Sequence, residues 1–124
     1  MRRSAILAIM IAILPSVFGQ SGKQLIFVRI PEQLQPLDRG AKYEDPLDAA
    51  LKKHAVGEVS GGGSLLSAPD KNGKRSIEWV GIDVDLTNFE KGLPILKREL
   101  RRLGAPHNTV LEYTRDGKKI EEKL

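Results

Sequence analysis

The chain has 124 residues, no cysteine and a formal net charge of +4. Without cysteine there are no disulfides, thiolate metal sites or thiol catalysis, so a hydrophobic core must stabilise the fold. Residues 1–19 contain two of the 20 basic side chains and none of the 16 acidic ones, which leaves the rest of the chain near +2. This balance gives no reason to expect nucleic acid or an anionic membrane surface as a partner.

The first nineteen residues have the pattern of a secretory signal peptide. Arg2 and Arg3 precede a short apolar run, and Val17 and Gly19 form a small-residue cleavage site before Gln20. The apolar run is shorter than the roughly 20 residues that a membrane-spanning helix needs. A cleaved signal is therefore favoured over a retained anchor, and we expect a periplasmic or secreted protein with no stable membrane anchor after cleavage.

Residues 20–124 are expected to form one α+β domain. The apolar segment Leu25–Ile30 predicts a strand covered on both faces. A polar connector follows, over residues 32–43, as a surface excursion or a short helical turn. Asp45 as N-cap and Pro46 in the first helical position then predict a helix that Gly57 ends.

The middle of the chain predicts two paired strands. Glu58–Leu66 is expected to be a strand bent or bulged at its glycines, Gly61, Gly62 and Gly63. An Asn-Gly turn leads into a long strand, Ser76–Leu86. One face of that strand is apolar, and the other carries Trp79, Gly81, Asp83 and Asp85.

A second helix and a last strand complete the pattern. Thr87 and Glu90 form a capping box, and Pro94 is expected to kink the helix or mark its first turn. Gly104 is expected to stop the helix, whose buried stripe is Phe89, Leu93, Leu96, Leu100 and Leu103. A strand over Thr109–Thr114 and a short extra C-terminal strand follow. The order β-α-β-β-α-β predicts a ferredoxin-like fold, with two helices on one face of an antiparallel sheet.

Several short segments carry a family resemblance. They are Leu37-Asp38-Arg39-Gly40, Glu44-Asp45-Pro46-Leu47, Gly57-Glu58-Val59 with the three glycines that follow, Asp83-Val84-Asp85-Leu86 and Leu103-Gly104-Ala105-Pro106. In these the chain resembles a family of small, mostly uncharacterised bacterial α+β domains. The resemblance implies a single α+β domain and brings no activity, cofactor or catalytic residue.

The candidate chemical groups are few. Asp83 and Asp85 project from one strand face about 7 Å apart, which could suit a hard cation or acid–base work. No third ligand stands at a motif spacing, so these carboxylates are more simply explained as solvated strand residues. The glycine segment lacks the Lys-Ser or Lys-Thr of a phosphate loop. His54 continues an apolar helical stripe and His107 lies in a turn.

Phe27 and Trp79 suggest an aromatic sheet face. RNA-recognition sheets use such residues, but carboxylates on the same face would repel phosphates. We therefore expect a non-catalytic, exported protein-binding module, of immunity or inhibitor type, or a self-associating protein. Its binding residues are Phe27, Trp79, Asp83, Asp85, Gly61, Gly62 and Gly63, and no catalytic residue, metal or cofactor is assigned. The alternative is a small metal-dependent hydrolase that uses Asp83 and Asp85, with Glu58 as a third carboxylate.

Overall fold

The computed structural model describes residues 22–124, so the predicted signal peptide and its cleavage before Gln20 lie outside the described residues. The elements are β1 Gln24–Ile30, α1 Pro36–Arg39, the π-helical turn η2 Gly40–Glu44, α2 Asp45–Lys53, β2 Gly57–Leu66, β3 Ile77–Leu86, α3 Phe89–Arg102, β4 Val110–Arg115 and β5 Lys118–Lys123. In this part of the chain, no helix has the length and apolar character needed to cross a bilayer.

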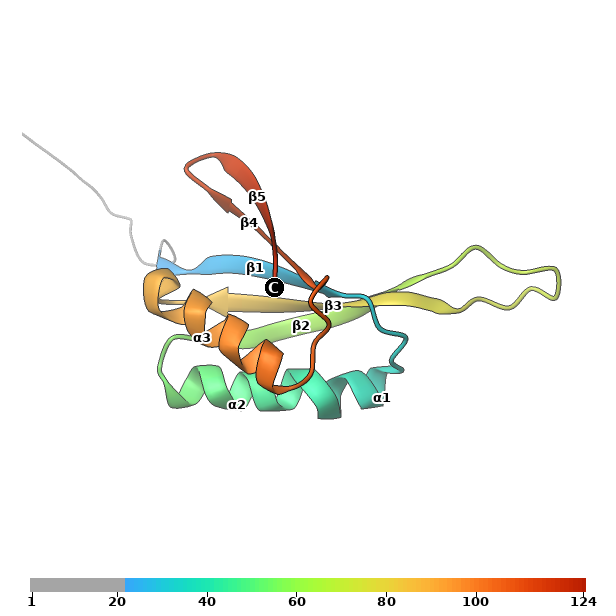
Figure 1. Cartoon of the computed structure of the whole chain (residues 1–124), viewed down its shortest axis with the longest axis horizontal. Helices are drawn as coiled ribbons and strands as arrows, with labels where there is room; N and C mark the ends of the chain where they lie inside the picture. The colour runs from blue at the N-terminus through green and yellow to red at the C-terminus, as the bar shows by residue number, and fades with distance from the viewer. Residues whose placement is uncertain (1–21) are drawn as a thin grey trace, which may run out of the picture.

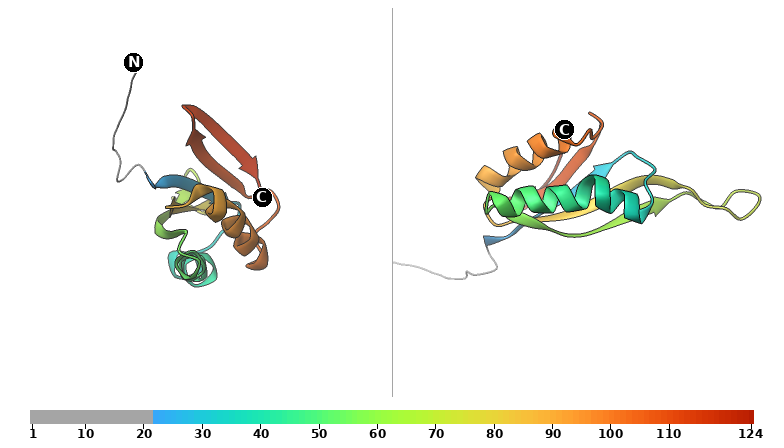
Figure 2. Two further views of the ribbon diagram at one scale, coloured as in Figure 1. Left: turned by 90° about the vertical axis from the view of Figure 1, so that its left-hand side faces the viewer. Right: turned by 90° about the horizontal axis from the view of Figure 1, so that it is seen from below.

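The five strands form one antiparallel sheet in the order β2-β3-β1-β4-β5. Figures 1 and 2 show α2 and α3 on the same side of this sheet. The first four strands have the ferredoxin-like order, and β5 adds a strand beyond β4. The predicted α+β class, the βαββαβ order and the extra C-terminal strand are therefore confirmed.

The core lies between the sheet and the two helices. Alternate residues of β1 and β3 point into it, and Leu96 and Leu100 of α3 meet them. The alternation was predicted for β3, but the prediction that β1 is covered on both faces is wrong. The outward residues of β1 lie on the sheet face without helices, where Leu25 is 54% exposed. The fully buried apolar side chains of β1, β3 and the helices are Ile26, Val28, Ile30, Tyr43, Leu47, Leu51, Val80, Ile82, Val84, Leu86, Leu96 and Leu100. Because both helices cover the core face of the sheet, the opposite face has no helix over it.

The first helix begins ten residues earlier than expected, at Pro36, so the prediction that Asp45 is its N-cap is wrong. The connector is itself helical, and the Asp45 amide donates to the Gly40 carbonyl five residues before it. Pro46 has no N–H, and in a regular α-helix its ring would clash with the carbonyl four residues earlier. The π turn removes that conflict. The helix also ends before Gly57, at Lys53, and Gly57 begins β2.

The start of α3 also differs from the expectation by one residue. Asn88, not Thr87, is the N-cap, and its side chain accepts a hydrogen bond from the Lys91 amide at 3.0 Å. Pro94 lies inside a continuous helix. Gly104 follows the last turn with φ of +89°, which confirms the predicted glycine stop.

A polar cluster around Glu122 joins the β4–β5 hairpin to α3. Glu122 accepts hydrogen bonds from Lys97 at 2.7 Å and from the Tyr113 hydroxyl at 2.6 Å. Burial, helped by that hydrogen bond, raises the pKa of Tyr113 to about 12. Burial alone would raise the pKa of Glu122, but the hydrogen bonds from Lys97 and Tyr113 bring it below its ordinary value.

Beyond the end of β1, β2 and β3 continue as a two-stranded arm (residues 65–79) that projects from the body of the protein (Figure 1). β1 stops at the pair Ile30 and Val80, so β1 does not pair with the arm. The register of β2 shifts at Ser60 and again between Leu65 and Leu66. The predicted irregularity of this glycine-containing strand is confirmed.

Candidate functional site

Phe27 and Trp79 lie together on the sheet face opposite the helices, which we call the open face. Their ring centroids are 6.0 Å apart with an interplanar angle of 75°, an edge-to-face contact. The Phe27 ring lies across Gly81, where an added Cβ would stand 2.5 Å from its Cζ atom. Because Gly81 has no side chain, the Phe27 ring has room to lie against β3 and contact Trp79.

A cation completes this arrangement. The Arg29 guanidinium carbon lies 5.8 Å from the centroid of the Trp79 ring, within the range of a cation–π contact. Arg29 also forms an ion pair with Glu112 of β4 at 2.8 Å. Phe27 and Arg29 therefore both contact Trp79 in the unbound protein and favour its present orientation.

Two exposed leucines extend the apolar surface along the open face. Leu25 is 54% exposed and lies two residues before Phe27 on β1, while Leu65 is 42% exposed and pairs with Trp79 across β2 and β3. We call Leu25, Phe27, Trp79 and Leu65 the aromatic stripe. A contiguous apolar stripe on a face without helices is typical of an interaction surface.

Asp83 and Asp85 lie beside the stripe, on the face where the alternation of β3 placed them. Asp83 pairs with Phe27 and Gly61, and Asp85 pairs with Leu25 and Glu58. Glu58 therefore joins the two aspartates on the open face. Between residues 22 and 124 no three His, Cys, Asp or Glu side chains gather as a metal ion would require. The three carboxylates form a negative border on one flank of the stripe.

The glycine segment divides between the two faces of the sheet. Gly61 pairs with Asp83 and Gly63 with Gly81, so both belong to the open face. Gly62 points the other way, and an added Cβ there would collide with the Glu44 carboxylate. The segment is thus a β-strand that lets the Glu44 side chain of η2 approach closely, and only part of it lies beside the stripe.

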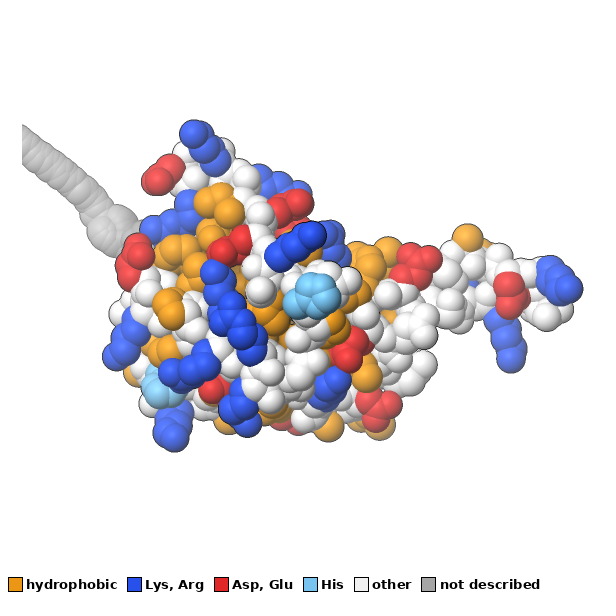
Figure 3. All heavy atoms as spheres, in the orientation of Figure 1, with side chains coloured by type: hydrophobic (Ala, Val, Ile, Leu, Met, Phe, Trp, Pro, Cys, Tyr) orange, Lys and Arg blue, Asp and Glu red, His pale blue; other side chains and the backbone are white. Residues whose placement is uncertain are grey.

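The histidines are apart from this face. His54 is the C-cap of α2, and His107 is exposed in the turn before β4. On the helix-bearing side, Figure 3 shows Lys and Arg side chains gathered over α3. The acidic border of Glu58, Asp83 and Asp85 lies on the open face.

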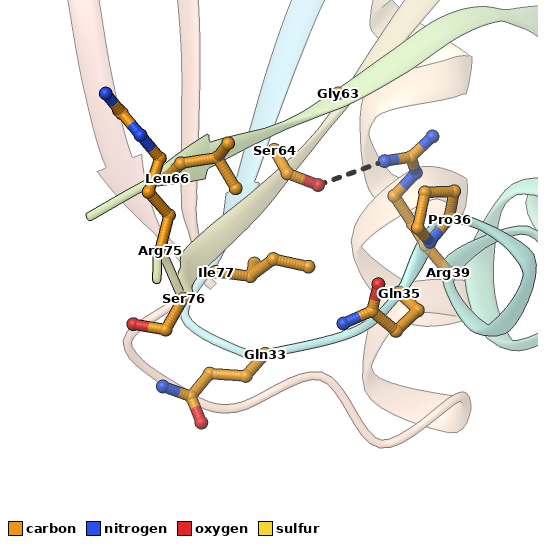
Figure 4. Close-up of a pocket in the computed structure, with 10 residues that line it drawn as sticks. All are labelled: Gln33, Gln35, Pro36, Arg39, Gly63, Ser64, Leu66, Arg75, Ser76 and Ile77. Atoms are coloured by element: carbon orange, nitrogen blue, oxygen red, sulfur yellow. Dashed lines mark hydrogen bonds between the residues drawn. The ribbon is translucent and has the colours of Figure 1, made fainter. Parts of the chain in front are cut away.

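A groove of about 720 Å³ lies at the base of the arm, on the helix side. It is lined by Gln33, Gln35, Pro36, Arg39, Gly63, Ser64, Leu66, Arg75, Ser76 and Ile77. Figure 4 shows Ile77 and Gln35 pointing toward each other across it, with Arg39 joined to Ser64 above them. This groove was not predictable from the sequence, because its walls come from three segments that meet only in the fold.

No known family model and no curated protein matches the chain. Among solved structures, the chain is similar to a phage SAM lyase in complex with S-methyl-5'-thioadenosine. The identity is 11%, the TM-score is 0.46, and the alignment covers 83% of this chain and 91% of that chain. A similarity of this degree carries no inference about function.

The sequence placed Trp79, Asp83 and Asp85 on one side of a strand, and the structure puts them there with Phe27. The sequence did not indicate Arg29, Leu25 or Leu65 as members of this surface, because their positions depend on the pairing of β1 and β2 with β3. The one sign in the sequence was that β1 has apolar residues on both of its faces, with Leu25 and Phe27 on the outer one.

Proposed function

We propose that this protein is an exported, non-catalytic binding module whose open face docks on another protein. The observation that carries the proposal is the preorganised pair of Phe27 and Trp79, seated on Gly81 and backed by Arg29. Aromatic residues are enriched in the cores of protein interfaces, and a side chain already held in place loses little entropy on binding.

The border of the stripe specifies the chemistry of the partner. Glu58, Asp83 and Asp85 line one flank of the stripe and would meet lysine or arginine side chains. The partner surface we expect is an apolar patch with a basic rim. The small size and predicted export of this chain fit an immunity or inhibitor protein.

Variants on the two sides of the molecule test the proposal. The tagged protein would be incubated with the extracytoplasmic fraction of its own cells, and captured proteins quantified by mass spectrometry. Trp79→Ala removes the centre of the stripe, and Leu37→Ala is its control, because Leu37 is 88% exposed on α1, away from the open face. Asp83→Lys reverses a border charge, with Glu90→Lys on α3 as its control.

One protein should be enriched by the wild type and by both controls, and lost with Trp79→Ala and Asp83→Lys. For the purified pair, each of these two variants should raise Kd at least about tenfold, which corresponds to about 1.4 kcal/mol. Equal capture by all four variants would show that the open face is not the binding surface. A wild type that captures only itself, and elutes as an oligomer in the same variant-dependent way, would identify a second copy as the partner.

Export is tested separately by intact mass. Protein recovered from the native compartment should begin at Gln20, because Val17 and Gly19 satisfy signal peptidase. A mass that retains residues 1–19 would refute the cleaved signal without bearing on the open face.

A further inference from the structure

The groove at the base of the arm lies on the other side of the sheet from the aromatic stripe. Its apolar wall is formed by Leu66 and Ile77 of the arm and by Pro36 at the start of α1. Leu66 is 49% exposed, so this wall is open to solvent. A volume of about 720 Å³ is within the range of small-molecule sites, about 300–1,000 Å³.

The charged groups of the groove all have one sign. Arg39 and Arg75 line it, and none of the ten lining residues is acidic. The other polar groups are the amides of Gln33 and Gln35 and the hydroxyls of Ser64 and Ser76. Such a lining favours a ligand that accepts hydrogen bonds and carries negative charge.

Arg39 is held in place at the inner end of the groove. Its side chain is 12% exposed, its Nε atom forms an ion pair with Glu44, and its Nη1 atom donates to Ser64 Oγ at 3.2 Å. A guanidinium has five N–H donors, so these two contacts leave others for a ligand. Glu44 orients the guanidinium from outside the lining of the groove.

Arg75 supplies the second cation from the rim of the groove. Within residues 22–124 no carboxylate forms an ion pair with it, and it belongs to the exposed part of the arm. Figure 4 shows it beside Leu66, at the opposite end of the groove from Arg39. Its charge is therefore not paired with a carboxylate in the described part of the chain.

We propose that this groove binds a small organic anion. The apolar body of the ligand would lie on Pro36, Leu66 and Ile77, and its carboxylate or phosphate group would accept hydrogen bonds from the arginines and from Gln35. This site is distinct from the protein-binding face and does not depend on it.

Four probes with the same six-carbon chain separate the possible sources of affinity: hexanoate, hexyl phosphate, hexanamide and hexylammonium. Each would be titrated into the full ¹⁵N-labelled protein while the amide resonances of Ser64 and Ile77 are followed. We expect saturable shifts with at least one anion, at a Kd in the millimolar range or tighter, and at least tenfold weaker binding of the amide and the ammonium. The tighter of the two anions identifies the charged group. Equal responses to all four probes, or no saturation by either anion at about 20 mM, would overturn the proposal.

A charge reversal on the arm provides the matched pair of variants. Arg75→Glu should weaken binding of the preferred anion at least tenfold, while Lys71→Glu, the same change of charge at the tip of the arm, should leave it unchanged. Equal affinity for wild type and Arg75→Glu would refute the contact with Arg75. Asp83→Lys, on the other face, should not alter the titration, so failure of this site and failure of the protein-binding face are distinguishable.

Discussion

Substitution of Gly81 by alanine should disorganise the open face while leaving the fold intact. An added Cβ would stand 2.5 Å from Cζ and 2.6 Å from Cε1 of Phe27, too close for the ring to remain where it lies. The ring is only partly buried, so it can swing toward solvent, and the edge-to-face contact with Trp79 is then lost. The backbone itself need not move.

The expected change in stability is small because two effects oppose each other. Loss of the aromatic contact costs about 0.5–1.5 kcal/mol. Replacing glycine with alanine in a strand gains about 0.5–1 kcal/mol through conformational entropy. The free energy of unfolding of Gly81→Ala should therefore stay within about 1 kcal/mol of the wild type, and the control Gly63→Ala, whose Cβ meets nothing within 4 Å, should be stabilised.

The decisive readout is Trp79, the single tryptophan of the chain. Its near-ultraviolet circular dichroism and its emission maximum should change in Gly81→Ala and not in Gly63→Ala, and partner capture should fall in Gly81→Ala. Urea denaturation followed by far-ultraviolet circular dichroism measures stability independently. An unchanged Trp79 signal with full partner capture would refute the reasoning that Gly81 seats the aromatic pair.

Three further predictions concern the core, the carboxylates and the polar cluster. Leu100→Ala should cost about 2–5 kcal/mol in chemical denaturation, and a loss below about 0.5 kcal/mol would contradict its full burial. The double variant Asp83→Asn and Asp85→Asn should fold with nearly wild-type stability. Calcium or manganese at millimolar concentration should not raise the wild-type melting temperature, and a saturable rise that the variant lacks would favour the metal-dependent alternative. The Tyr113 phenol has its pKa raised from 10.0 to about 12 in the folded state, so its stabilising contribution is complete below pH 10 and is lost as the pH rises to about 12. Tyr113→Phe should therefore lose less stability than the wild type between these pH values, and equal losses would contradict the shift.

The sheet and the position of α3 were predictable because their side-chain patterns are regular. Alternation along Val80–Leu86 leaves one face of β3 for the core, and the spacing of Leu96 and Leu100 leaves one stripe of α3 to meet it. These patterns reflect which side chains face the core, and that does not change if a strand or helix begins one or two residues earlier or later. The buried faces of β3 and α3 could therefore be predicted without knowing where each element ends.

The start of the first helix was not predictable from local signals. Asp45 and Pro46 have the residue types of a helix start. They nevertheless lie inside a longer helical segment, directly after the π turn of residues 40–44. The preceding segment is held in that helix by tertiary contacts, since Tyr43 is fully buried in the core and its hydroxyl donates to Glu32. Capping preferences describe only the neighbouring backbone, and here packing overrides them.

The groove was hidden for the same reason. One of its walls begins at Pro36, which the sequence placed in a polar connector, and another is the arm, whose faces depend on strand register. Each lining residue is unremarkable in its own segment. Only the added turns of helix bring Arg39 within reach of Ser64.

The arm presents different residues to the two proposed sites because its register shifts. Leu65 pairs with Trp79 and Leu66 pairs with Ile77, which leaves Glu78 as an extra residue of β3 between the two pairs. The extra residue changes the alternation of β3, so that Trp79 lies on the open face and Ile77 points into the groove. An arm with apolar residues on both faces, and no pairing to β1, is a two-stranded segment that has little stability of its own. Binding on either face would cover part of it, and the bulge at Glu78 is the feature that allows one short hairpin to serve both surfaces.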